Sequence, residues 1–197
     1  PMHFPNLVIN SPASQANIRF GLSHSSTTIS NGYTAGLDAL IVAVDMIRSG
    51  KGKIMLAGGA EELSNHLHMG FALGGALSPS RALRPFDGER DGFLLGEGAA
   101  MVLVETLEGA RARGAEILAE IAGFSSNFKP SEPSPDPEGA VRAMKGALAD
   151  AGKVAEEIDF VAASANGSVE GDLEEALAIR EVFGAAPSVP VVAYKAY

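Results

Sequence analysis

The hydrophobic pattern changes its period repeatedly along the chain, and this limits the possible folds more than any other feature. Residues 26–30 are rich in β-branched side chains and precede a turn, which predicts a short strand. Residues 33–49 have apolar positions around most of a helical circumference, broken mainly by Asp38 and Asp45, and Gly50 follows. The apolar run 53–58 then favours a strand covered on both faces, as in a parallel sheet.

The same alternation continues to the end of the chain. We predict a weak helix at 63–73, a long ordered loop up to residue 97, a strand at 99–105, a helix at 107–113, a strand at 117–124, a helix from Asp136 to Gly152, a strand at 158–163, a helix at 172–183 and a strand at 189–193. Strands that alternate with helices indicate an α/β fold with a mostly parallel sheet.

Two observations bear on domain organisation. The element order before about residue 105 resembles the order after about residue 116, which suggests two related halves. The prolines within 129–135 form the one linker-like stretch of the sequence. The last predicted strand has no returning helix, so we expect a fragment of a longer polypeptide, with 1–128 from one half and 129–197 beginning the next.

Composition excludes several classes of function. The 197 residues contain no cysteine, which removes disulfides, thiolate metal sites and a thiol nucleophile. The formal net charge of −9 argues against binding a nucleic-acid backbone. No apolar run is long enough for a membrane span, and the start has no secretory pattern. We therefore expect a cytoplasmic protein that binds neither nucleic acid nor membrane.

Three motifs together carry a family resemblance. The first spans Arg84-Pro85-Phe86-Asp87, Arg90-Asp91-Gly92-Phe93 and Gly96-Glu97-Gly98-Ala99. The second spans residues 21–36, with Gly58-Gly59-Ala60-Glu61 after the following strand. The third spans Ser164-Ala165-Asn166-Gly167 and Gly171-Asp172-Leu173-Glu174-Glu175. In this order and at these separations they resemble the β-ketoacyl-acyl-carrier-protein synthase (ketosynthase) family. The resemblance covers nearly the whole chain. It implies the central part of a thiolase-like α-β-α-β-α layered fold.

The first motif supplies candidates for an active-site loop or tunnel wall, namely Arg84, Asp87, Arg90, Asp91, Phe93, Gly96 and Glu97. A structural alternative covers the same residues. Alternating Arg and Asp can pair with each other, while glycines permit the backbone turns of the loop.

The second motif departs from the family at its nucleophile. The family pattern Thr-Ala-Cys-x-x-Gly begins a helix with a cysteine, and Tyr33 stands in the place of that cysteine. A helix N-terminus favours a thiolate, whereas a phenol with a pKa of about 10 stays protonated at neutral pH. Tyr33 is therefore expected either to pack as a structural residue or to fill the space of an acyl thioester.

The third motif lacks the family's histidine. Asn166 stands at that position, and an amide does not relay a proton as imidazole does. Asp172 and Glu175 match the family's Gly-Asp-x-x-Glu and also fit a capping box for the following helix. Lys195 matches the lysine of the family's catalytic set and is its one retained member.

These departures resemble the cysteine-less chain-length-factor subgroup. The resemblance implies a non-condensing subunit that forms a heterodimer with an active ketosynthase, shapes the tunnel of the growing acyl chain and meets the acyl carrier protein indirectly, in polyketide, polyene or fatty-acid synthesis. The rival interpretation is an enzyme with residual malonyl-carrier decarboxylase or acyltransferase activity that depends on Lys195. A third is a purely structural fragment.

No cofactor is expected under any of these interpretations. His66 and His68 are spaced to bind a metal, but the sequence offers no evident third ligand, so we also expect no metal site.

Overall fold

The structure is a computed structural model that describes residues 8–128, 135–184 and 189–196. The chain divides into two units: residues 1–61 with 98–117 (unit 1), and residues 62–97 with 118–197 (unit 2). Each unit is interrupted in sequence by the other. The predicted linker at 129–135 lies, apart from residue 135, outside the described residues.

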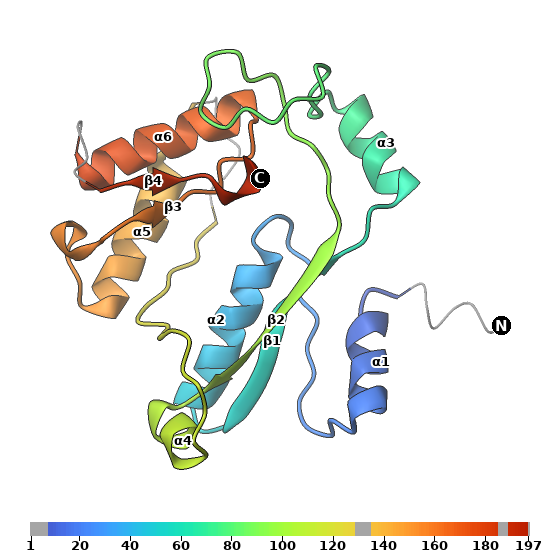
Figure 1. The fold of residues 1–197 in the computed structure, drawn as a ribbon, viewed down its shortest axis with the longest axis vertical. Helices are drawn as coiled ribbons and strands as arrows, with labels where there is room; N and C mark the ends of the chain where they lie inside the picture. Colours follow the sequence, from blue (N-terminus) through green and yellow to red (C-terminus); the bar gives the residue numbers. More distant parts are fainter. Residues whose placement is uncertain (1–7, 129–134, 185–188, 197) are drawn as a thin grey trace. The chain divides into compact units, whose positions relative to one another are not determined.

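Unit 1 contains helix α1 (Ser11–Phe20), helix α2 (Ala35–Arg48), strands β1 (Ile54–Glu61) and β2 (Gly98–Glu105), and helix α4 (Leu107–Ala112) (Figure 1). Helix α1 was not predicted from the sequence, although Pro12 in its first turn and Gly21 in a left-handed conformation at its end are start and stop signals. The other four elements confirm the predictions to within a few residues.

The β1–β2 pair is antiparallel, with Ile54 opposite Glu105 and Glu61 opposite Gly98. Helix α2 packs on one face of this pair. Gly36 on α2 meets Gly59 on β1 so closely that a side-chain carbon added at Gly59 would lie 3.4 Å from the Cα of Gly36. The expectation of parallel pairing for residues 53–58 was wrong in this respect. Ile54 and Leu56 on β1 are also about half exposed, so the apolar run predicted neither the strand direction nor cover on both faces within the chain.

Unit 2 contains helix α3 (Asn65–Leu73), a loop from 74 to 97, helix α5 (Glu138–Ala151), strand β3 (Val161–Ala162), helix α6 (Val169–Phe183) and strand β4 (Val191–Val192), with short 3₁₀ turns Ala155–Glu157 and Tyr194–Ala196. Strands β3 and β4 pair in parallel. The core joins these elements through Ala163, Ala165 and Ile179, with Phe86 and Phe183 packed against them. The α/β class is therefore confirmed, and the mixed strand directions follow from two separate two-stranded sheets.

Two predicted strands are absent as strands. Residues 26–30 and 117–124 pair with no other described segment, so neither has the ladder of hydrogen bonds that defines a strand. Near the end of the second segment, the Phe124 backbone N–H donates to Asp150 on α5 at 3.1 Å. Gly123 lies so close to α5 that an added side-chain carbon would be 2.4 Å from the Ala151 nitrogen. This segment therefore ends against a helix.

None of the helices in the described ranges has the length and apolar character that crossing a membrane requires.

Candidate functional site

The loop of the first motif is fastened to the start of α6 by Arg90. Its guanidinium donates from Nε to the Ser168 carbonyl at 3.3 Å, from one terminal nitrogen to the Val169 carbonyl at 2.6 Å, and from the other to the Asp87 carbonyl at 2.8 Å. A guanidinium presents donors in a rigid fork, so it fixes several carbonyls at once. Arg90 thus joins two motifs that are about 80 residues apart in sequence.

Asp91 and Asp87 are not bonded as predicted. Asp91 accepts from the Ser78 hydroxyl at 2.6 Å and from the Ser80 backbone N–H at 3.2 Å, and Asp87 accepts from the Glu89 backbone N–H at 2.7 Å. The Ser78 bond is the main reason that the pKa of Asp91 lies below its ordinary value, because hydrogen bonding favours the charged carboxylate. Arg84 lies 3.9 Å from the carboxylate of Glu89. Hydroxyls and backbone groups therefore provide the hydrogen bonds of Asp87 and Asp91, in place of the alternating Arg–Asp pairs.

The rest of the loop makes further contacts within unit 2. Phe93 is 6% exposed, and its ring meets that of Phe71 edge-on with 5.2 Å between centroids. The carboxylate of Glu97 accepts from the Leu63 backbone N–H at 3.3 Å, next to the start of α3. Around Gly96 there is open space for a side chain. Phe93 and Glu97 therefore have structural contacts, and their predicted part in a tunnel stays a prediction.

Asp172 does not cap α6. The helix begins at Val169 with Ser168 as its N-cap, so Asp172 lies inside the first turn. Its side chain is buried and accepts from the backbone N–H of Phe86 at 2.8 Å and of Gly167 at 3.1 Å. The capping prediction was wrong because the helix starts three residues earlier than its apolar pattern indicated. The carboxylate instead joins the loop, the third motif and the positive end of α6.

Glu175, one helical turn after Asp172, also binds backbone N–H groups of the third motif. Its two oxygens accept from the backbone N–H groups of Ser164 at 2.7 Å and Ala165 at 2.8 Å. Ala165 has a φ of 39°, a left-handed conformation that is uncommon outside glycine. Asn166 accepts from the Ser168 N–H at 3.0 Å through its side-chain oxygen. The segment that follows β3 is thus held by side chains of α6 and by its own turn.

Lys195 lies after β4 and donates to the Ser164 hydroxyl at 3.1 Å. Because β3 and β4 are parallel neighbours, the residues that follow them come to the same edge of the sheet. The structure therefore brings together Asn166, Lys195, Asp172 and Glu175 of the predicted site residues in one unit. The site also contains Ser164, which was not predicted as a site residue. Its position directly after a predicted strand and near Asn166 was the sequence signal that could have identified it.

Tyr33 belongs to unit 1 and lies two residues before α2, in the turn that leads to the Thr34 N-cap. The predicted helix therefore begins at Ala35, so Tyr33 precedes its first turn. The ring is 77% exposed within the chain. Partial burial raises the pKa of the phenol above its ordinary value, so the neutral form dominates at physiological pH.

The turn that carries Tyr33 is ordered by Asp38 in the first turn of α2. One oxygen of this carboxylate accepts from the Thr34 hydroxyl at 2.8 Å and from the side-chain amide of Asn31. The turn is thus locked on both sides of Tyr33.

No group of three or more metal-ligating side chains in the described ranges is arranged to hold a metal ion, and this includes the surroundings of His66 and His68 on α3.

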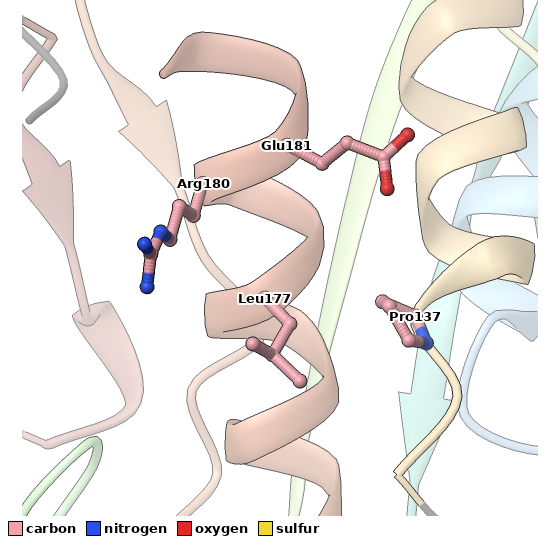
Figure 2. Close-up of a pocket in the computed structure, with 4 residues that line it drawn as sticks. All are labelled: Pro137, Leu177, Arg180 and Glu181. Atoms are coloured by element: carbon pink, nitrogen blue, oxygen red, sulfur yellow. The ribbon is translucent and has the colours of Figure 1, made fainter. Parts of the chain in front are cut away.

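A shallow depression lies between α5 and α6, lined by Pro137, Leu177, Arg180 and Glu181 (Figure 2). Figure 2 shows Arg180 and Glu181 pointing to opposite sides of α6. Glu181 also forms an ion pair with Lys145 on α5 at 2.9 Å. None of the predicted site residues lines this depression, so it is separate from the site built around β3 and β4.

Two family models match the chain in order. The model described as beta-ketoacyl synthase, N-terminal domain, matches residues 2–110, and the corresponding C-terminal domain model matches residues 118–197. The chain belongs to the beta-ketoacyl synthase family. This confirms the resemblance drawn from the three motifs. The predicted division of the halves at residue 128 stays a prediction.

Named relatives agree with this assignment. The 3-oxoacyl-[acyl-carrier-protein] synthase 2 of Vibrio cholerae is 38% identical over 98% of this chain and 49% of its own length. A solved structure titled "AntDE:AntF (apo): type II PKS acyl-carrier protein in complex with its ketosynthase bound to the hexaketide" matches with a TM-score of 0.89 and 34% identity, covering 95% of this chain and 49% of the other.

A third match is the structure titled "The ishigamide ketosynthase/chain length factor", with a TM-score of 0.79 and 40% identity over 85% of this chain and 42% of the other. The thiolase-like ketosynthase fold predicted from sequence is therefore confirmed. The chain spans about half the length of the curated relatives it matches.

Proposed function

We propose that this beta-ketoacyl synthase family chain is a non-condensing subunit that acts with an active ketosynthase in acyl-chain elongation. One observation carries the proposal: Tyr33 stands before α2 where the family motif has its cysteine, and the chain has no cysteine elsewhere. Condensation needs a nucleophile that takes the acyl group from its carrier. A neutral phenol with a raised pKa is poorly suited to that step.

The site in unit 2 supports the same conclusion. Asn166 replaces the imidazole, and its side-chain oxygen is already bonded to the Ser168 N–H. An amide neither takes up nor releases a proton at neutral pH, so the proton transfers of condensation lack their usual agent. Asp172, Glu175 and Arg90 keep the architecture of the segment through backbone contacts. The segment therefore keeps its shape while it lacks the group for proton transfer.

The expected partner is an active ketosynthase, in a heterodimer of the chain-length-factor kind. The match to the ishigamide ketosynthase/chain length factor supports this kind of partner. We place the interface at residues 26–30 and the start of α2. Residues 26–30 belong to no helix or strand, are largely exposed and have no strand partner within the described chain, and Tyr33 is exposed beside them. A strand from a partner would supply the missing hydrogen bonds.

The charge distribution supports docking of an acidic acyl carrier protein mainly on the partner. Residues 1–61 and 98–117 hold six basic and six acidic side chains, so the whole of the −9 formal charge falls on unit 2. Two negative surfaces repel at long range. A cytoplasmic location forms part of the proposal.

The test is co-purification of the tagged chain with the active ketosynthase encoded beside it. We expect one complex by size-exclusion chromatography, with ketoacyl product formed by the pair and no product from the chain alone. As a disruption probe, Thr28→Pro removes a backbone donor from the proposed interface strand, with Ser14→Ala on α1 as the control. Failure of the two proteins to associate under all conditions would overturn the proposal.

The alternative is residual decarboxylation of malonyl groups, and the contact between Lys195 and Ser164 is the observation that favours it. A retained ammonium group near the third motif could stabilise an enolate as carbon dioxide leaves. The purified chain incubated with malonyl carrier protein separates the two functions. Formation of acetyl carrier that is lost in Lys195→Met supports the enzyme, whereas unchanged malonyl carrier supports the partner subunit.

A further inference from the structure

We infer that Ser164 and Lys195 form a serine–lysine pair able to accept a short acyl group as an ester on the serine oxygen. The two side chains meet at 3.1 Å, from Nζ to Oγ. This inference goes beyond the proposed function, since it concerns a nucleophile other than the position of the family's cysteine.

The fold brings the pair together from two adjacent strands. Ser164 comes two residues after β3, and Lys195 comes three residues after β4, at the same end of a parallel pair. Catalytic side chains of α/β proteins gather at the carboxyl ends of parallel strands. Both side chains are exposed within the described chain.

The backbone of the nucleophile is fixed before any substrate arrives. Glu175 accepts from the N–H groups of Ser164 and Ala165, and Ala165 takes its left-handed φ of 39° directly after the serine. Backbone strain of this kind is found at functional sites, where the surrounding contacts maintain it. The hydroxyl is therefore presented from an ordered turn.

The chemistry requires only these two groups and the acyl donor. The chain has no thiol, so a covalent acyl group must be carried on oxygen or nitrogen. Lysine serves as the base for serine in known Ser–Lys variants of the catalytic triad, and it does so as the neutral amine. The 3.1 Å contact already places the amine nitrogen of Lys195 within proton-transfer distance of the Ser164 oxygen.

The Ser164 oxygen attacks the carbonyl carbon of an acyl thioester, and its proton passes to the neutral amine of Lys195. The carbon–sulfur bond then breaks, and the departing sulfur takes that proton. The products are an acyl ester on Ser164, a free thiol and the neutral amine.

The experiment uses the full chain with acetyl-pantetheine as the thioester and p-nitrophenyl acetate as an activated ester, at neutral and alkaline pH. Acylation is followed by intact mass, and its position by peptide mapping. We expect one acetyl group on Ser164, which Ser164→Ala abolishes. Lys195→Arg keeps the positive charge but removes the base, so we expect labelling to slow by about 10²-fold or more.

Two substitutions of the same types serve as controls. Ser126→Ala removes an exposed hydroxyl, and Lys153→Arg alters a lysine that is ion-paired with Glu157. Both are expected to label as the unmodified chain does, with circular dichroism confirming the fold of every variant. Acetyl found on Lys195 or at scattered lysines, equal labelling of Lys195→Arg, or no labelling at either pH would each overturn the inference. These results leave the association test of the proposed function unaffected.

Discussion

The carboxylate of Asp172 accepts a hydrogen bond from the backbone N–H of Phe86 at 2.8 Å, across 86 residues of sequence. Asp172 is 1% exposed, and it also accepts from the N–H of Gly167. A buried carboxylate is stable only when its oxygens are satisfied, and here backbone donors and the N-terminal end of α6 satisfy them. This one side chain therefore couples the loop of the first motif to the third motif.

Replacing Asp172 by Asn should destabilise the chain. The amide keeps the size of the side chain, but its NH₂ group must face backbone N–H donors, which leaves buried groups unsatisfied. We expect a loss of about 1–3 kcal/mol in the free energy of unfolding, measured by urea denaturation. Glu170→Gln, an exposed change of the same type in the same helical turn, is the control. Equal effects of the two changes would mean that burial of Asp172 contributes nothing.

Gly167 should be intolerant of a side chain. Its φ is +84°, and an added Cβ would lie 2.8 Å from the carbonyl oxygen of Gly92. The backbone N–H of Gly92 also donates a hydrogen bond to the Gly167 carbonyl, so the two backbones are held close together. Gly167→Ala therefore adds a backbone clash to left-handed strain. Gly75→Ala isolates the strain, because Gly75 has a φ of +66° and open space around it. We expect the first change to cost more than the second, whose cost should be about 1–2 kcal/mol by urea denaturation.

Helices and strands with strong local patterns were predictable from sequence, whereas the two unpaired segments were not. Helices α2 and α5 follow from apolar periodicity with Gly50 and Gly152 as stops, and both glycines have positive φ. Residues 26–30 and 117–124 have strand-like composition, but a strand exists only through its partner. The local sequence indicates the propensity of a segment to form a strand, but it does not show whether another strand lies beside that segment.

The sequence predicted most of the residues of the site, but it did not predict which groups they contact. Asp172 and Glu175 were recognised by their spacing, which fits a helix cap equally well. Their actual partners are backbone groups of Phe86, Gly167, Ser164 and Ala165, brought near by tertiary packing. A capping pattern can be recognised from a few neighbouring residues, whereas contacts formed in the folded chain cannot be recognised from a single sequence.

The hydrogen bond between Ser78 and Asp91 should give the chain a pH-dependent stability. The bond lowers the pKa of Asp91 in the folded state, so its contribution is complete above the ordinary aspartate value of about 3.9 and is lost as pH falls through the lower folded value. The stability difference between the unmodified chain and Asp91→Asn should therefore be largest near neutral pH and shrink in acid.

The measurement for Asp91 is urea denaturation at a series of pH values from neutral to acid. Asp159→Asn, which removes an exposed carboxylate, controls for the change in net charge. Ser78→Ala should reproduce the pH profile of Asp91→Asn, because it removes the main cause of the pKa shift. A difference that grew on acidification would have the wrong sign for a lowered pKa.

Introducing a thiol at Tyr33 tests the proposal that this chain does not catalyse condensation. Tyr33→Cys places a thiol at the turn before α2, where the helix N-terminus favours the thiolate. We expect faster alkylation by iodoacetamide than for a cysteine placed at exposed Ser126, and acyl loading from an acyl carrier. We expect no ketoacyl product, because Asn166 still cannot act as a proton relay.

The double variant Tyr33→Cys/Asn166→His should form more ketoacyl product than either single variant, as measured by mass spectrometry. Condensation by the single Tyr33→Cys variant would instead place the whole defect at the nucleophile.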